Sequence, residues 1–288
     1  MGISLAKYLG TTLLTLSVFL NPAYASGQAE PLRIATTPVF LDEQAEFLQS
    51  WGRYLQQRLK RPVSFVQRAS YREITTLLKS GKVDYAWICG YPYVRNRNSF
   101  SLTAVPLYHD KPLYQSYLIV PANDTRTRHI SDLRDTLFAY ADPDSNSGWL
   151  SPQIELLNAG INSNGFFHKT FFTGAHRKVV EAVASGLAQG GAVDGYIWET
   201  LSHLHPELTN QTRVAWRSRP FGFPPIVARK DLPTQEQEAM RRVLLGMNQD
   251  SEGRALLARL NLTGFGAAEP GLFDSIDAAS RRIRPFGS

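Results

Sequence analysis

Short apolar runs alternate along the chain with segments whose apolar residues recur every three or four positions. The run LRIAT at 32–36 is typical of a buried strand, whereas residues 40–59 repeat apolar side chains at helical spacing. VSFVQ at 63–67, a helical pattern at 71–80 and VDYAWIC at 83–89 continue the alternation. Strands that alternate with helices predict parallel strand pairing, with the helices packed on the faces of the sheet.

A second set of alternating elements follows the first. It comprises predicted strands at 136–142, 171–176 and 191–198 and a predicted helix at 177–189. The end of the chain is predicted to be helical, at 234–247 and 251–260. Two long predicted strands, 113–121 and 212–218, bracket the second set. This nesting predicts an α/β protein in which one lobe is inserted into another, with two crossing segments between them. Such a hinged cleft is a usual place for a small ligand.

The first residues have the layout of a secretory signal peptide. Lys7 precedes an apolar run over 8–20, which is too short to span a bilayer, and the small-x-small pattern AYA follows at 23–25. We therefore expect residues 1–25 to be removed on export. Because there is no cysteine near the cleavage site, we expect no lipid anchor. The expected lobes are then 26–115 with 214–288, and an inserted lobe at 116–213.

Composition narrows the range of partners. The chain has 31 Lys and Arg against 25 Asp and Glu, a formal net charge of +6, and its basic residues are spread along the chain. That distribution argues against nucleic-acid binding. A mild positive charge suits a small anionic ligand, but a solvated basic surface is its more usual explanation. The single cysteine, Cys89, excludes an internal disulfide, and its apolar neighbours predict a buried thiol.

Ligands of open α/β sheets bind beyond the carboxyl ends of the strands, beside helix N-termini. The segment Ser145-Asn146-Ser147-Gly148 follows one predicted strand and precedes a helical pattern. Unpaired backbone N–H groups and short hydroxyl side chains at such a helix start make an anion site that needs no lysine. An ordinary helix N-cap explains the same residues, so the pattern leaves both interpretations open.

The same rule selects further candidates in other turns. His176 is placed to donate to a phosphoryl-type oxygen, or to face solvent in a first helical turn. Tyr71, Tyr91 and Tyr114 have positions from which a phenol reaches the cleft, or packs in the core. Glu199, at the end of a predicted strand, suits an ammonium group or favours a helix start.

Motifs of hydrolases and nucleotide-binding enzymes are absent from the sequence: there is no G-x-S-x-G, H-E-x-x-H or G-x-x-x-x-G-K-[ST]. Ser147, His176 and Asp194 can be drawn as a triad, but their spacing does not require one. His203 and His205 flank one residue, and we interpret them as a pair of loop histidines rather than a metal site.

The chain resembles the periplasmic phosphate-, phosphite- and phosphonate-binding proteins that serve ABC importers. The resemblance covers about residues 32–264. It is carried by SYREITTLLKSGKVDYAWICGYPYV, DPDSNSGWLSP, TGAHRKVVEAVASGLAQGGAVDGYIWE and PPIVARKDLP. It implies a two-lobed type II periplasmic binding protein, a periplasmic monomer without enzymatic activity or cofactor, and an ABC permease as partner. A receptor that feeds a signalling protein, or a Ser/His hydrolase, is the alternative.

By position, the resemblance implies a set of ligand-binding residues: Tyr71, Tyr91, Tyr114, Ser145, Asn146, Ser147, His176 and Glu199. One departure affects the ligand. Relatives that bind aminoalkyl phosphonates carry an acidic residue just before the P-I-V segment, where this chain has Phe223 and Pro224. The departure favours phosphate, phosphite or methylphosphonate, and leaves Glu199 as the nearby residue that might replace the missing acid.

Overall fold

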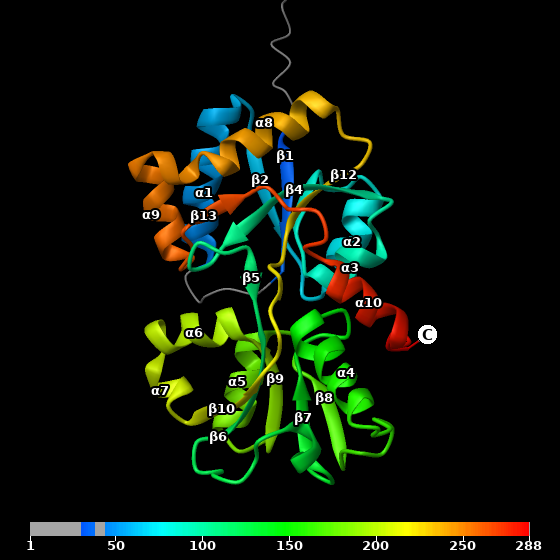
Figure 1. The fold of residues 1–288 in the computed structure, drawn as a ribbon. Helices are drawn as coiled ribbons and strands as arrows, with labels where there is room; N and C mark the ends of the chain where they lie inside the picture. Colours follow the sequence, from blue (N-terminus) through cyan, green and yellow to red (C-terminus); the bar gives the residue numbers. More distant parts are fainter. Residues whose placement is uncertain (1–29, 38–43, 288) are drawn as a thin grey trace, which may run out of the picture.

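The computed structural model describes residues 30–37 and 44–287, which form two lobes joined by crossing segments (Figure 1). Each lobe is built on its own β-sheet with helices packed against it. The predicted signal peptide lies outside the described residues. Within the described ranges, no helix is both long and apolar enough to cross a membrane.

The first lobe contains a six-stranded sheet in the order β13-β4-β12-β3-β1-β2. Strand β1 pairs in parallel with β2 and β3, as the alternation of strands and helices predicts. The pairs β12–β3, β12–β4 and β13–β4 are antiparallel. The elements of this lobe are β1 (Leu32–Thr36), α1 (Gln44–Leu59), β2 (Val63–Gln67), α2 (Tyr71–Lys79), β3 (Tyr85–Trp87), α3 (Gly90–Arg95), β4 (Phe100–Leu107), β12 (Ile226–Arg229), α8 (Thr234–Leu245), η3 (Met247–Gln249), α9 (Ser251–Arg259) and β13 (Gly264–Gly266).

The second lobe contains a five-stranded sheet in the order β10-β6-β9-β7-β8. Its strands β7, β8 and β9 are parallel, whereas β6 pairs antiparallel with both β9 and β10. The elements are β6 (Ser116–Pro121), η1 (Ile130–Leu133), β7 (Leu137–Tyr140), η2 (Asn146–Leu150), α4 (Ser151–Asn158), β8 (Lys169–Phe172), α5 (His176–Ala184), β9 (Gly190–Asp194), α6 (Gly195–Leu204), α7 (Pro206–Thr209) and β10 (Thr212–Arg217).

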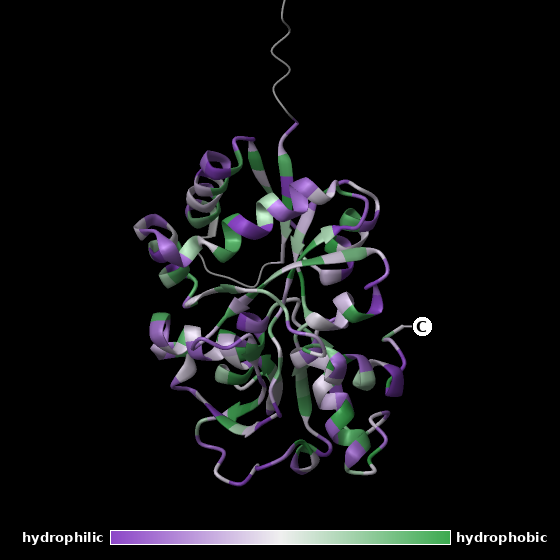
Figure 2. Ribbon diagram, turned by 45° about the horizontal axis from the view of Figure 1, so that its top comes forward, coloured by the Kyte–Doolittle hydropathy of each residue, from purple (hydrophilic) through white to green (hydrophobic). Residues whose placement is uncertain are grey.

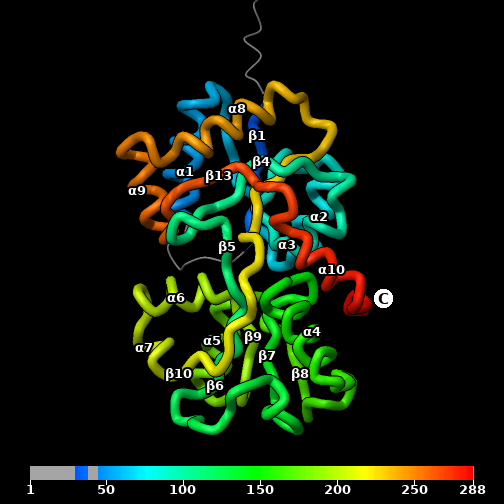
Figure 3. The backbone as a smooth tube through the Cα atoms, in the orientation of Figure 1, coloured from blue at the N-terminus to red at the C-terminus, as the bar shows by residue number. Residues whose placement is uncertain are grey.

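Two antiparallel segments run between the lobes, as Figure 3 shows in teal and yellow. The predicted strand 113–121 divides at Gln115: β5 (Leu113–Tyr114) pairs with β11 (Phe221–Gly222), and β6 enters the second sheet. β10 returns toward β11. The expected lobe boundary at 213 falls inside β10. The lobe boundaries stay a prediction.

The predicted strand 191–198 is wrong in its second half. β9 ends at Asp194 and α6 begins at Gly195, because the Asp194 side chain caps the helix by accepting the Tyr196 backbone N–H at 2.9 Å. Trp198 and Glu199 therefore lie within a helix rather than at a strand end. Asp194, which the pattern places in mid-strand, occupies the strand end instead.

Hydrophobic residues occur along the strands and helices of both lobes (Figure 2), and most of the large ones are buried in the core. Helix α1 shows how the helical spacing becomes packing. Its Trp51, Tyr54 and Leu55 are each no more than 1% exposed, and the Trp51 ring stacks on Phe65 of β2 at 5.3 Å between centroids. Burial of an aromatic side chain of this size contributes on the order of 2 kcal/mol relative to exposure.

The C-terminal helix α10 (Asp274–Arg282) touches both lobes. On the first lobe, Ile276 packs so closely on Gly90 that a Cβ there would lie 2.6 Å from the Ile276 Cδ1 atom. On the second, the Arg282 guanidinium donates to the Asn158 side chain at 3.0 Å, and the Phe286 ring contacts the Trp149 ring. The C-terminal segment is therefore a third link between the lobes.

Candidate functional site

The turn after β7 has the expected helix-start geometry and is completely buried. Ser145 caps it, with its Oγ accepting the Gly148 backbone N–H at 2.9 Å, and a π-helical turn, η2, leads into α4. Gly148 is needed for this packing. A Cβ at that position would lie 2.5 Å from the Ala141 Cβ and 3.1 Å from the His176 Cε1.

Several hydrogen-bonding groups at this turn are buried without any partner. They include the Ser147 hydroxyl and the Asn146 side-chain carbonyl oxygen, and across the cleft the Tyr91 hydroxyl of α3. The Tyr91 ring stacks on Trp149 of η2, with centroids 6.0 Å apart. A buried polar group without a partner costs about 1–3 kcal/mol, so these groups are placed to gain from a polar ligand.

Two groups outside the second lobe contact the same turn. The Asn146 side-chain amide donates to the Tyr114 hydroxyl at 2.9 Å, and the Asn146 backbone N–H donates to the Cys89 sulfur at 3.2 Å. Burial raises the pKa of Cys89 to about 11 and raises the pKa of Tyr114 well above its usual value. Both groups are therefore protonated at neutral pH. The buried thiol is confirmed, with Cys89 2% exposed.

His176 sits behind the turn as a neutral imidazole. Its Nδ1 accepts the Asp194 backbone N–H at 3.1 Å, which leaves the ring proton on Nε2. Nε2 faces the Ser145 Oγ at 3.5 Å. Burial of the ring lowers the pKa of His176 from 6.5 to about 3. In this arrangement His176 positions Ser145, and a direct contact with a ligand stays a prediction.

The Asp142–Asp144 segment holds the lobes together beside the turn. The Asp142 carboxylate accepts the Tyr71 backbone N–H at the start of α2, at 3.4 Å. The Asp144 carboxylate lies 3.4 Å from the guanidinium groups of both Arg72 and Arg95. Because all three partners belong to the first lobe, these contacts join its helices α2 and α3 to the second lobe.

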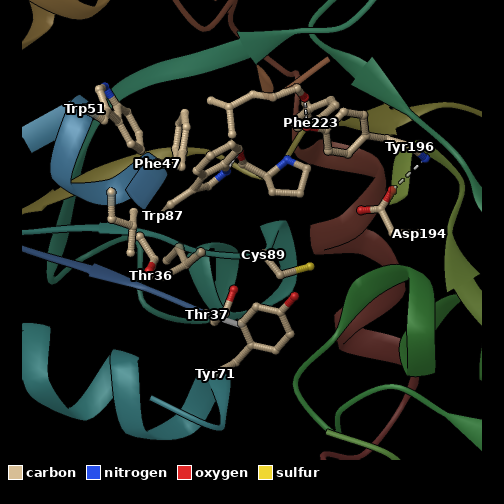
Figure 4. A pocket seen from close by; sticks show the side chains of 14 residues that line it. Thr36, Thr37, Phe47, Trp51, Tyr71, Trp87, Cys89, Asp194, Tyr196 and Phe223 are labelled. Atoms are coloured by element: carbon tan, nitrogen blue, oxygen red, sulfur yellow. Dashed lines mark hydrogen bonds between the residues drawn. The ribbon is translucent and has the colours of Figure 1, made fainter. Parts of the chain in front are cut away.

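A cavity opens in front of Tyr71 and Cys89 (Figure 4). Its polar end holds Tyr71, Thr37, Cys89 and Asp194, and its other walls are mainly apolar and aromatic. The lining residues are Thr36, Thr37, Phe47, Leu48, Trp51, Tyr71, Trp87, Ile88, Cys89, Asp194, Tyr196, Phe223, Pro224 and Leu260. Residues 145–147 are not among the lining residues, but Cys89 in the cavity wall accepts the Asn146 N–H and so connects the cavity wall to that turn.

Hydrogen bonds join four of the predicted residues in two groups that meet at neighbouring chain positions 145 and 146. Asn146 bonds to Tyr114 and Cys89, and Ser145 bonds to Gly148 and faces His176, which bonds to Asp194. Tyr71 and Cys89 share the cavity wall.

The Glu199 carboxylate is hydrogen-bonded to two tyrosines outside the cavity. Its two carboxylate oxygens accept the hydroxyl protons of Tyr108 and Tyr117, and it is not among the lining residues of the cavity.

Asp194 joins this set of bonded residues although the sequence pattern did not assign it to ligand binding. Its signal is local: an Asp followed by Gly at the end of an apolar run is a helix N-cap pattern. Treated as a cap, the residue would move from mid-strand to the carboxyl end of β9, which is where ligands of such sheets bind.

The hydrolase alternative does not fit the geometry. A serine-protease-type triad needs a histidine that takes the serine proton and donates from its other nitrogen to a carboxylate. Here the His176 Nδ1 accepts a backbone N–H, and Nε2 faces Ser145 while the Ser147 hydroxyl has no partner. Within the described ranges, no group of three or more His, Cys, Asp or Glu side chains is placed to hold a metal.

We predict that His176→Asn flattens the acid side of the stability profile. The pKa of His176 is lowered in the folded state, so below pH 6.5 the unfolded chain takes up a proton first. Its contribution to stability is therefore lost as pH falls from 6.5 toward about 3. Urea unfolding at several pH values measures this, with the exposed His168→Asn as control. Equal pH dependence in both variants would contradict the prediction.

Two α/β lobes, two crossing strands and a polar site at the ends of the strands define a solute-binding protein of the type II periplasmic class. The chain belongs to the family described as "ABC transporter, phosphonate, periplasmic substrate-binding protein", which matches residues 34–272. This family supplies solute-binding components of transporters rather than enzymes.

Individual relatives agree with this assignment. The "Phosphonates-binding periplasmic protein" of Escherichia coli (strain K12) is 26% identical over 268 residues, covering 90% of this chain and 78% of the relative. The "Probable ABC transporter phosphite binding protein PhnD1" of Prochlorococcus marinus (strain MIT 9301) is 22% identical, covering 97% and 98%. The solved structure of that PhnD1 with methylphosphonate has a TM-score of 0.79 at 21% identity, covering 87% and 97%, and so shares the fold.

Proposed function

We propose that this chain binds a small phosphorus oxyanion between its lobes and delivers it to an ABC permease. The observation that carries the proposal is the set of buried hydrogen-bonding groups left without partners on both sides of the cleft. Ser147 and Asn146 contribute from the second lobe and Tyr91 from the first. A ligand that satisfies groups on both lobes favours the closed arrangement, because it binds the open one less well.

The site suits an anion held by neutral donors. No lysine or arginine is among the described lining residues of the cavity. Burial raises the pKa values of Tyr71 and Tyr114 well above the usual value, so both phenols keep their protons and can donate. The helix start at 145–148 adds the partial positive charge of aligned peptide groups. These are binding groups without a matched acid and base for turnover.

The residues that line the cavity indicate which group the phosphorus carries besides its oxygen atoms. Phe223 and Pro224, which replace the acidic residue of aminophosphonate binders, line the cavity together with Trp87. Glu199 is already bonded to two tyrosine hydroxyls, so it is a poor substitute for that acid. We therefore propose phosphate, phosphite or methylphosphonate as ligand in preference to an aminoalkyl phosphonate.

The family is periplasmic. We further propose that residues 1–25 are a signal peptide, and that the mature chain is a monomer in the periplasm without a lipid anchor. The charge pattern and the AYA cleavage sequence at 23–25 support this proposal. The absence of a concentrated basic patch in the sequence argues against nucleic acid as a further partner.

A thermal-shift screen tests the proposed ligand. The purified mature chain is heated with phosphate, phosphite, methylphosphonate, aminoethylphosphonate, sulfate or amino acids. At 100 times its dissociation constant, a ligand of the folded state adds about 2.7 kcal/mol of stability. We expect a phosphorus oxyanion to give the largest rise in melting temperature. A rise with only sulfate or only an amino acid would show that the assignment is wrong.

A further inference from the structure

Glu199 of α6 joins the two lobes through a contact outside the cavity. Its carboxylate accepts hydroxyl protons from two tyrosines that belong to different lobes. Tyr117 lies on β6 of the second sheet, whereas Tyr108 directly follows β4 of the first sheet. The Tyr108–Glu199 hydrogen bond therefore crosses between the lobes, and the Tyr117–Glu199 hydrogen bond stays within one of them.

The turn that carries Tyr108 is fixed to the first lobe. The Tyr108 backbone N–H donates to the Lys111 backbone oxygen at 2.9 Å, and the Asp110 backbone N–H donates to the Thr263 hydroxyl, before β13, at 3.1 Å. Burial, and then the hydrogen bond to Glu199, raises the pKa of Tyr108, so its phenol keeps the proton. The turn thus presents a fixed donor to the helix of the other lobe.

Two further hydrogen bonds join α6 to the end of α9 in the first lobe. The Tyr196 hydroxyl donates to the Leu260 backbone oxygen, and the Asn261 side-chain amide donates to the Thr200 hydroxyl at 3.1 Å. Carbonyl groups at a helix C-terminus lack partners within their own helix, so Tyr196 satisfies one of them from the other lobe. Asn261 has a φ of 53°, a left-handed conformation that asparagine adopts more readily than most residues.

The three bonded side chains of α6 share one face of the helix. Tyr196, Glu199 and Thr200 stand at positions i, i+3 and i+4, which are neighbours on a helix surface. The same face adjoins the cavity, because the Tyr196 and Phe223 rings both line it, with their centroids 4.9 Å apart. The Tyr108 ring also contacts the Tyr196 ring, at 5.1 Å between centroids. Movement of α6 away from the first lobe would break these contacts and open the cavity wall together.

Hydrogen bonds that exist only while the lobes touch stabilise the closed arrangement whether or not a ligand is bound. The apparent dissociation constant of a ligand that needs this arrangement is its intrinsic constant divided by the closed fraction of the protein. A contact of this kind changes the affinity for every such ligand by one common factor. It leaves the order of preference among ligands unchanged.

We propose that the α6 contacts with the first lobe are a latch, which sets how tightly the site binds without selecting which anion it binds. The latch consists of Tyr196, Glu199 and Thr200 on α6 with Tyr108, Leu260 and Asn261 on the first lobe. The inference rests on the proposed function for the identity of the ligand, but not for the closing of the lobes. It makes Glu199 a positioning residue instead of a ligand contact.

Tyr108→Phe and Tyr117→Phe test the latch as a matched pair, because each removes one hydroxyl that donates to Glu199. Titration calorimetry measures the affinities for phosphite, methylphosphonate and phosphate. We expect Tyr108→Phe to weaken binding of all three by about 10-fold, the lower end of the effect of one hydrogen bond to a charged group. Tyr117→Phe should keep the wild-type affinities, although urea unfolding should show a similar loss of stability in both variants.

Asn261→Gly tests the other end of the latch. It removes the amide that donates to Thr200, and glycine adopts the left-handed conformation of this position without strain. Affinity should fall by about 2- to 10-fold, the effect of a neutral hydrogen bond, and equally for the three anions. Without ligand, small-angle X-ray scattering should give a larger radius of gyration for Tyr108→Phe and Asn261→Gly than for the wild type and Tyr117→Phe.

Two affinity results would overturn the latch while the proposed function stands. One is equal affinity in folded Tyr108→Phe and Tyr117→Phe. The other is a loss confined to one anion, which would make Tyr108 and Glu199 part of the ligand contact. If the wild type binds no phosphorus oxyanion, the proposed function is wrong and scattering alone decides the latch. Equal radii of gyration in all four ligand-free proteins would then overturn it as well.

Discussion

Replacing Ser147 with alanine is expected to weaken binding of phosphite or methylphosphonate by about 10- to 150-fold, which corresponds to about 1.5–3 kcal/mol. The Ser147 hydroxyl is fully buried and has no hydrogen-bond partner within the protein. Its removal therefore takes away a donor to the bound anion without breaking a bond of the free protein. Titration calorimetry measures the affinity, and denaturant unfolding without ligand should show stability unchanged or slightly raised.

A matched control tests whether loss of a buried, unpaired hydroxyl lowers affinity only at the proposed site. The Thr103 hydroxyl is also buried and without a partner, but it lies on β4 of the first-lobe sheet rather than at the Ser145–Ser147 turn. Thr103→Val should leave affinity at the wild-type value. Unchanged affinity in Ser147→Ala, with the fold intact, would remove Ser147 from the site.

Gly148→Ala is expected to lower the free energy of unfolding by about 1–3 kcal/mol, the usual effect of overpacking. The added methyl group would lie 2.5 Å from the Ala141 Cβ, 3.0 Å from the Ser145 Oγ and 3.1 Å from the His176 Cε1. Relief of these contacts must displace Ser145 or His176, so ligand affinity should fall as well. Urea denaturation and calorimetry measure the two effects.

Gly52→Ala makes the same chemical change where there is room for it. Gly52 lies within α1, and its added Cβ would have its nearest neighbour at ordinary contact distance, 3.6 Å. Alanine favours a helix over glycine by up to about 1 kcal/mol, so this variant should equal or exceed wild-type stability. Equal stability losses at positions 52 and 148 would refute the packing explanation at the turn.

Much of the architecture could be predicted from local pattern. The parallel pairing of β1 with β2 and β3 follows from alternating apolar runs and helical spacing, because each periodicity buries one face. The helix start at Ser145 was also predictable, since its cap bond to Gly148 joins residues three apart. Neither inference requires knowledge of distant residues.

The errors arose where a local pattern fits two structures. The apolar run GAVDGYIW suits a strand throughout, yet capping by Asp194 starts a helix within it and carries Glu199 away from the strand end. The polar C-terminal segment, to which the sequence pattern assigned no element, forms α10 because Ile276 and Ala279 are buried. Short apolar runs do not separate strand from helix without their neighbours.

The sequence by itself determined the class of fold, the two crossing segments and the hydroxyl-rich helix start, because these depend on periodicities and bonds within a few residues. Only the tertiary structure decided what surrounds that helix start. Cys89 and Tyr114 come from separate segments and bond to Asn146 across 57 and 32 residues, and Asp194 bonds to His176, beside the turn, across 18 residues. Even the position of the proton on the His176 ring depends on a distant group, the backbone N–H of Asp194 at the end of β9. Charge, protonation and selectivity at a buried site follow from such long-range neighbours, and the chain order does not reveal them.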